Sequence, residues 1–258
     1  MAAERPKIET SQDAVLGGRL QLRQPLRGHR VGHDAILLAA ATGGRANEHA
    51  VDLGAVVGGA GLALAARVAS LNVTLIEIDA ALCGLAAENA ALNRMDDRVR
   101  VLEADAENIS ALTEGGLSGK TVERVLMNPP FNDPARQTTS PDPRRRLAHA
   151  GEPGLLARWV ATAAWLLKPQ GVLTLIWRAD ALPEVLSALA SAFGGIAVLP
   201  VLPRADAPAI RVLVRAIKSG SGARGDFPAL ILNDAEGKPS AHAEAVLRNC
   251  ATLPLAEL

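Results

Sequence analysis

The feature that most constrains the fold is an alternation of apolar runs and helical segments that begins at Ala50. Apolar runs this dense predict strands buried on both faces of a mostly parallel sheet. We therefore predict an α/β, doubly wound, seven-stranded sheet. Its last two strands follow each other across a Pro-rich loop, which predicts an antiparallel edge hairpin. The predicted strands are Val51–Leu53, Asn72–Ile78, Val99–Ala104, Val122–Met127, Gly171–Trp177, Ile196–Leu202 and Ile210–Ile217. The predicted helices are Gly59–Ser70, Ala80–Arg94, Pro153–Lys168 and Leu182–Phe193.

The 258 residues suit one large domain with small additions at either end. Residues 1–45 predict a hairpin around Gly17-Gly18, followed by a helix Ala35–Ala41 that Asp34 can cap. Residues 46–218 form the predicted main domain. Residues 219–258 begin with a Gly/Ser-rich link and predict a small C-terminal flap packed on the same domain, with a helix from Ser240.

Composition excludes several classes of protein. Lys plus Arg (27) balances Asp plus Glu (27), so no global field points to nucleic acid, although a local basic patch is compatible with this balance. Cys83 and Cys250 stand far apart, and the five histidines show no ligand spacing, so we predict neither a disulfide framework nor a metal site. No apolar run is long enough to span a bilayer, and we expect a soluble cytoplasmic protein without a membrane partner.

One predicted strand runs directly into Asn128-Pro129-Pro130-Phe131. Prolines have a fixed φ and no N–H, so their carbonyls and the Asn128 amide oxygen can serve as preset acceptors beside the flat Phe131 ring. Converging acceptors next to an aromatic ring suit a planar ring that carries an –NH2 group. The alternative is an ordinary Pro-rich turn after a strand.

Three further strand ends carry suggestive residues. Asp52 precedes a glycine-rich turn that allows close backbone approach to a ligand. Glu77 ends the second strand, where a carboxylate can accept from two ribose hydroxyls. Asp105 follows the third strand and can accept from an adenine amino group. Individually, Asp52 or Asp105 could cap a helix and Glu77 could be an ordinary surface charge, but the ordered series favours a nucleotide-like site at one sheet edge.

With these residues in place, the sequence resembles the class I, S-adenosylmethionine-dependent methyltransferases that act on an amino nitrogen and have a Rossmann-like sheet. It is most similar to the bacterial small-domain group that includes the valine-tRNA adenine-N6 methyltransferase. The resemblance runs from about Asp13 to the end. It includes the segment Gln24-Pro25 to Leu37-Leu38-Ala39 and the segment Leu166 to Gly171.

The resemblance implies S-adenosyl-L-methionine as cofactor and two sets of site residues. The catalytic set, which holds the target amino group and stacks on its base, is Asn128, Pro129, Pro130 and Phe131. The cofactor-binding set is Arg30, Asp52, Gly54, Gly58, Glu77, Asp105, Ala106 and Asn128.

One departure from the family pattern concerns the turn after Asp52. Val56 stands where the middle glycine of Asp-x-Gly-x-Gly-x-Gly is expected. A β-branched residue disfavours positive φ. We therefore expect either that the turn shifts by one residue and uses Gly58-Gly59, or that cofactor affinity is reduced.

The predicted substrate is an adenine N6 in a tRNA. Arg136 and Arg144-Arg145-Arg146 follow the catalytic motif, and with Arg19, Arg23, Arg27 and Arg30 they predict a basic rim for phosphates. A solvated charged loop is the simpler interpretation of the same residues. The alternatives are a ribosomal RNA guanine-N2 methyltransferase, a protein glutamine methyltransferase, and a non-catalytic relative that only binds cofactor or RNA.

Overall fold

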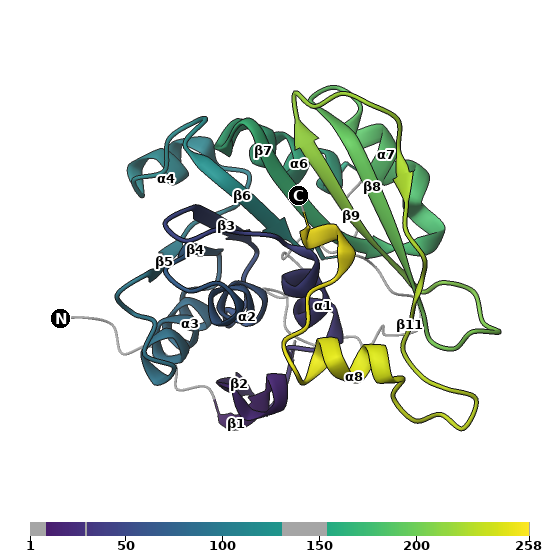
Figure 1. Ribbon diagram of the computed structural model, residues 1–258. Helices are drawn as coiled ribbons and strands as arrows, with labels where there is room; N and C mark the ends of the chain where they lie inside the picture. Colours follow the sequence, from purple (N-terminus) through teal and green to yellow (C-terminus); the bar gives the residue numbers. More distant parts are fainter. Residues whose placement is uncertain (1–8, 29, 131–153, 258) are drawn as a thin grey trace.

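The computed structural model describes residues 9–28, 30–130 and 154–257. A nine-stranded sheet forms the middle layer, and helices cover both of its faces (Figure 1). The strands lie in the order β10-β8-β9-β7-β6-β3-β4-β5, and β11 also pairs with β8. Their bounds are β3 His49–Leu53, β4 Asn72–Glu77, β5 Val99–Glu103, β6 Val122–Met127, β7 Leu167–Arg178, β8 Phe193–Leu202, β9 Arg211–Lys218, β10 Gly225–Asp226 and β11 Leu230–Ile231.

The predicted α/β fold with a mostly parallel sheet is confirmed. Strands β3 to β7 pair in parallel, and β9 runs antiparallel between β7 and β8. The two-residue strands β10 and β11 add to the seven predicted ones along the outer edge of β8. The chain order reverses where β3 pairs with both β4 and β6, and a switch of this kind is where open α/β sheets bind ligands.

The sheet lies between two apolar cores, and each core is formed with the helices on one face of the sheet. Successive residues of β6 point to opposite cores: Val125 lies in the core with α4, α6 and α7, and Leu126 lies in the core with α1, α2 and α3. This explains why the strand is a continuous apolar run rather than an alternating one. The helices are α1 His33–Ala41, α2 Gly59–Arg67, α3 Ala80–Leu92, α4 Ile109–Glu114, α6 Leu155–Leu166, α7 Leu182–Leu189 and α8 Ala241–Leu247. Short 3-10 turns occur at η1 Leu16–Gly18, η3 Ala179–Ala181 and η4 Pro254–Ala256.

The predicted N-terminal hairpin is present. Strands β1 (Thr10–Val15) and β2 (Leu20–Pro25) pair antiparallel around the Gly17-Gly18 turn. The predicted cap at Asp34 is wrong, because α1 begins after Gly32 without a side-chain cap. Asp34 lies in the first turn instead, where its carboxylate pairs with Arg211 of β9 at 3.0 Å.

Some element ends differ from the sequence expectations. Helix α2 stops at Arg67 and α7 at Leu189, several residues early in each case. Strand β7 begins directly after α6, so Pro169 lies inside the strand rather than in a loop. A register shift between β6 and β7 accompanies this proline. The short helix α4, capped by the Asn108 side chain, was not predicted.

Hydrogen bonds to backbone groups hold the C-terminal segment against the main domain. The N–H of Leu253 donates to Ala40 of α1 at 2.8 Å. The Arg67 guanidinium donates to the carbonyls of Ala251 and Val246 at 2.7 and 2.9 Å. Because arginine has only donors, it satisfies carbonyls left free by an irregular segment. No helix within the described ranges is long and apolar enough to cross a membrane.

Candidate functional site

The predicted site lies at the carboxyl ends of the central strands. Leu53 of β3 pairs with Met127 of β6, so Gly54 and Asn128 follow side by side at the switch point. The turn after β3 is also joined to the next strand, because the N–H groups of Gly54 and Ala55 both donate to Ile76 of β4 at 2.9 and 2.8 Å. Residues from three neighbouring strands therefore meet at this edge.

Three alternate residues of the glycine-rich turn have left-handed backbone conformations. Gly54, Val56 and Gly58 have φ angles of +72°, +54° and +87°. The expected shift of the turn away from position 56 is therefore wrong, because Val56 itself has a positive φ. A non-glycine residue pays about 1–2 kcal/mol for this conformation, and a β-branched one is unusual there. The alternative expectation, a reduced cofactor affinity, stays a prediction.

Glu77 holds the strained turn. Its Oε2 accepts from the N–H of Val56 at 2.9 Å, and its Oε1 accepts from Ile78 and Asp79 at 3.0 Å each. The residue is 7% exposed, and this burial raises the pKa of Glu77 despite the opposing N–H groups. Glu77, the predicted ribose ligand, thus lies at the end of β4, and its carboxylate also bonds to the turn.

Asp52 lies beneath the same turn. Its Oδ2 accepts from the N–H of Gly61 in α2 at 2.8 Å. Burial raises the pKa of Asp52 to about 7, and the nearby Glu77 carboxylate contributes in the same direction. A carboxyl this deeply buried suits a cationic partner, since a positive charge would favour its ionised form. That chemistry fits the methionine ammonium of the implied cofactor.

The third strand end has a hydrogen-bonded corner. The Oδ1 of Asp105 accepts from the N–H of Glu107 at 2.9 Å, and Ala106 between them is buried. Ile78, which sequence reasoning missed, is 54% exposed directly after Glu77. A large exposed apolar side chain next to a strand-end carboxylate offers a flat ring a surface for contact. Its signal in the sequence is an isoleucine between the strand-end Glu77 and the helix cap Asp79.

Helix α6 closes the site from the other face, and its contribution had no signal in the sequence. A Cβ built on Gly54 would lie 2.4 Å from the ring of Trp159, so the indole packs directly against the turn. One residue earlier, the Arg158 guanidinium pairs with Glu107 at 2.6 Å. The amino-terminal part of α6 therefore contacts both the turn after β3 and the corner after β5.

Asn128 carries the most informative polar atom of the site. Its Oδ1 is buried and has no hydrogen-bond partner among the described residues. A buried acceptor without a donor is unfavourable by about 1–3 kcal/mol, so such atoms are often completed by a ligand. Pro129 is buried and Pro130 exposed beside it. Phe131 lies outside the described residues.

Arg30 is placed by the N-terminal hairpin. Its guanidinium donates to the Asp13 carboxylate at 2.6 Å and to the Pro25 carbonyl at 3.0 Å. Next to it, the side chain of Val31 packs on Gly59, at the start of α2. Arg30 is thus close in sequence to a contact with the turn, but its described partners belong to the hairpin. Its role in cofactor binding stays a prediction.

The proposed basic rim is only partly within the described residues. Arg19 donates to the Arg248 carbonyl at 3.1 Å, and Arg23 pairs with Glu88 at 3.0 Å on the surface. Arg27 is exposed. Arg136 and Arg144 to Arg146 lie outside the described residues.

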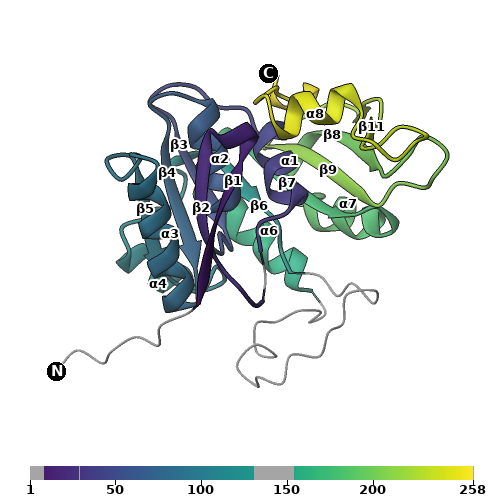
Figure 2. The ribbon, with the colours of Figure 1, turned by 90° about the horizontal axis from the view of Figure 1, so that it is seen from below.

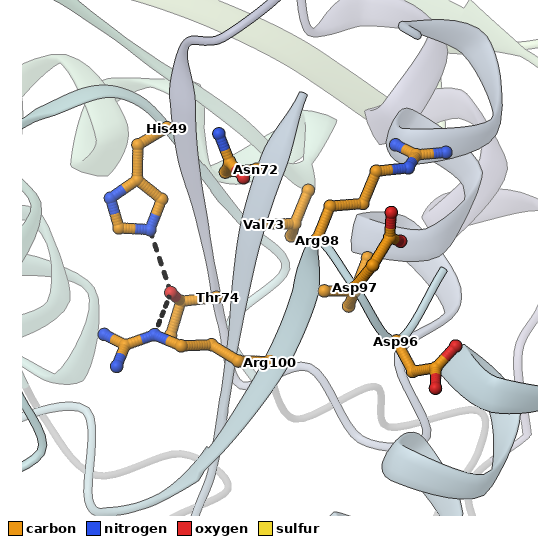
Figure 3. A pocket seen from close by; sticks show the side chains of 9 residues that line it. His49, Asn72, Val73, Thr74, Asp96, Asp97, Arg98 and Arg100 are labelled. Atoms are coloured by element: carbon orange, nitrogen blue, oxygen red, sulfur yellow. Dashed lines mark hydrogen bonds between the residues drawn. The ribbon is translucent and has the colours of Figure 1, made fainter. Parts of the chain in front are cut away.

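A cavity of about 380 Å³ lies at the opposite, amino-terminal edge of the sheet. Figure 3 shows His49 and Arg100 converging there on the Thr74 hydroxyl, at 2.8 and 2.9 Å. Burial and the Arg100 charge lower the pKa of His49, which favours a neutral ring in this network. Because the cavity is separated from the switch point by the length of the strands, it is not part of the predicted site.

Comparison with known proteins assigns the chain to a family. The family model described as methyltransferase small domain matches residues 31–200, a range that contains the turn and all of the strand ends described above. The chain therefore belongs to the methyltransferase small domain family.

The similar proteins are methyltransferases by name. A tRNA1(Val) (adenine(37)-N6)-methyltransferase of Porphyromonas gingivalis is 32% identical over 160 residues, which are 60% of this chain and 61% of that protein. A protein of the same name from Shewanella amazonensis is 33% identical over 132 residues, covering 50% and 53%. The chain thus spans less than two thirds of these relatives. A predicted O-methyltransferase of Agrobacterium tumefaciens has a TM-score of 0.71 and 29% identity, covering 85% of this chain and 97% of that one.

Two solved structures that share the fold at 14% and 18% identity are a geranyl diphosphate C-methyltransferase in complex with S-adenosyl-L-homocysteine and a SAM-dependent O-methyltransferase. The described residues fit S-adenosyl-L-methionine, the cofactor that the family resemblance implies. Two buried carboxylates, Asp52 and Glu77, lie at adjacent strand ends, and Ile78 presents an exposed apolar surface beside them. The unsatisfied Asn128 acceptor follows β6 next to the turn after β3.

Proposed function

We propose that the protein transfers a methyl group from S-adenosyl-L-methionine to the N6 amino nitrogen of an adenine in a tRNA. The observation that carries the proposal is the buried Asn128 Oδ1 without a partner, located next to the turn after β3. An amide oxygen at this place needs a donor, and an exocyclic –NH2 group supplies one.

The remaining site residues then have defined tasks. Asp52 accepts a hydrogen bond from the ammonium of the cofactor. Glu77 accepts one from a ribose hydroxyl, and Asp105 accepts one from the adenine amino group. The glycines of the turn allow the backbone to approach the methionine end closely.

The cofactor supplies an electrophilic methyl group on a sulfonium. Asn128 and the Pro129 carbonyl accept hydrogen bonds from the target amino group and orient its lone pair toward that methyl. The bound cofactor would supply this methyl group, and the amino nitrogen held by Asn128 and Pro129 would release its proton to water. Alignment of the target nitrogen with the methyl donor would supply most of the acceleration, so a covalent enzyme intermediate is unnecessary.

Support for tRNA as the substrate comes from the relatives, which are named tRNA1(Val) adenine-N6 methyltransferases. An adenine within structured RNA has to leave its stack to reach Asn128. We propose that Arg144, Arg145 and Arg146, with the exposed Arg27, contact phosphates around the opening. Charge reversal of Arg144–Arg146 then weakens RNA binding and reduces its salt dependence. Unchanged binding would assign that loop to the solvated surface.

Nucleoside mass spectrometry tests the proposal. The protein is incubated with S-adenosyl-L-methionine and total tRNA from a strain that lacks the corresponding gene, and the digested tRNA is analysed. We expect N6-methyladenosine. A methylated guanosine or a 2′-O-methylated nucleoside would replace the adenine-N6 assignment. Absence of cofactor binding in calorimetry would favour a non-catalytic relative.

A further inference from the structure

Two asparagines attach the N-terminal hairpin to the main domain. Asn89 lies in the last turn of α3, and Asn93 is the residue at the C-terminal cap of that helix. Each amide pairs with the backbone of one residue of β2, accepting from its N–H and donating to its carbonyl. Asn89 pairs with Arg23 at 2.7 and 3.0 Å, and Asn93 pairs with Gln21 at 2.9 and 2.7 Å. Figure 2 shows the hairpin alongside α3 and α2.

The two side chains differ in one bond. The Nδ2 of Asn89 also donates to the carbonyl of Val57 in the glycine-rich turn at 3.0 Å. Asn89 and Val57 are both fully buried, so water cannot replace this bond. The corresponding second bond of Asn93 goes to the Asn89 carbonyl within the same helix, at 2.7 Å.

The Asn89 bond and the Glu77 bond together fix the backbone on both sides of Val56, the strained residue of the turn. The N–H of Val56 is held by Glu77 from β4, and the carbonyl of the next residue is held by Asn89 from α3. Val56 lies between these two fixed groups with its left-handed φ of +54°. A valine released from either bond can return to a φ that its side chain prefers, and the turn would then change shape.

We propose that Asn89 is a positioning residue for the cofactor, since it holds the turn in the shape that a glycine at position 56 would adopt without strain. The identity of the cofactor in this proposal rests on the proposed function. The two hydrogen bonds that hold the turn do not depend on it, because they form without a ligand. Asn89 also makes the turn depend on the docking of the hairpin, because one amide group bonds Arg23 and Val57 together.

Two variants separate this role from simple attachment of the hairpin. Asn89→Ala and Asn93→Ala each remove a pair of bonds to β2, but only Asn89→Ala releases the Val57 carbonyl. Hydrogen exchange of residues 54–61 is measured on the free protein. We expect faster exchange in Asn89→Ala than in Asn93→Ala. Equal exchange in the two variants overturns the proposal. Asn89→Ser, which is too short to reach Val57, replaces Asn89→Ala if that variant is poorly folded.

Calorimetric titration with S-adenosyl-L-homocysteine tests the link to the cofactor. We expect affinity to fall roughly threefold to tenfold in Asn89→Ala, the size of one net hydrogen bond, and to stay near the wild-type value in Asn93→Ala. Adding Val56→Gly to Asn89→Ala should restore most of the lost affinity, because glycine adopts a left-handed φ without hydrogen bonds that enforce it. Equal losses in all variants overturn the proposal. If the wild type does not bind, the proposed function fails, and the exchange measurement still decides the role of Asn89.

Discussion

The backbone N–H of Val56 donates to Oε2 of Glu77 at 2.9 Å, so the carboxylate expected to bind the ribose already holds the cofactor turn. Together the two Glu77 oxygens accept from three N–H groups. A carboxylate has about four acceptor positions. A ribose diol would therefore have to share Glu77 with the turn, which links the shape at Val56 to cofactor binding.

Val56→Gly removes a half-buried side chain but also relieves its left-handed strain. We expect a change in the free energy of unfolding within about 1 kcal/mol, because strain relief of about 1–2 kcal/mol offsets the lost packing and the flexibility of glycine. Val57→Gly is the matched control at a fully buried neighbour without positive φ. It should destabilise by about 3 kcal/mol in urea unfolding. Equal losses for the two variants would contradict the strain at Val56.

Asp52 predicts a pH dependence of stability. Its pKa is raised from 3.8 to about 7 in the folded state. Between these values the native protein keeps a proton that the unfolded chain has released, so the free energy of unfolding falls as pH rises. The contribution is complete below about pH 4 and lost by about pH 7, with a slope of at most about 1.4 kcal/mol per pH unit.

Asp52→Asn should flatten this profile between about pH 4 and pH 7 and stabilise the protein above that window, while Asn Oδ1 keeps the bond to Gly61. Thermal unfolding without ligand across this range measures it. Asp97→Asn, at an exposed carboxyl, is the control that should leave the profile as it is. A wild-type profile that rises with pH through this window would show that Asp52 is already ionised.

Gly54→Ala tests the contact between the turn and α6. The new Cβ would lie 2.4 Å from the Trp159 ring, and φ at this position is +72°. We expect destabilisation by about 2–4 kcal/mol from the combined overlap and strain. Gly225→Ala, whose Cβ meets nothing within 4 Å, should change stability by less than about 0.5 kcal/mol. A Gly54→Ala variant as stable as the Gly225→Ala control would mean that Trp159 moves away freely.

Asn128→Ala should abolish methyl transfer to tRNA in a radiolabel assay and leave binding of S-adenosyl-L-homocysteine nearly unchanged. The reason is that Asn128 Oδ1 is a buried acceptor without a partner within the described chain, which leaves this oxygen for the amino group of the methyl acceptor. Asn249→Ala, at an exposed position shortly after α8, is the matched control. Normal transfer by Asn128→Ala would remove Asn128 from the catalytic set.

The order of the site residues could be predicted from local patterns. Apolar runs defined β3, β4, β5 and β6, and parallel strands bring their carboxyl ends to one edge. Asp52, Glu77, Asp105 and Asn128 could therefore be assigned to a common edge before any contact was known. The predicted strand bounds were less accurate where tertiary contacts decide them. An example is β7, which continues through Pro169.

By itself, the sequence determined the α/β fold, the strand ends and the acceptor motif at Asn128, because periodicity and proline act on neighbouring residues. Only the tertiary structure decided how the turn accommodates Val56. Its left-handed φ depends on Glu77, 21 residues away, and on the Val57 bond to Asn89, 32 residues away. The Trp159 contact with Gly54 joins residues that are even farther apart in the chain. Such contacts arise when separate strands and helices pack together, and no local pattern of residues specifies them.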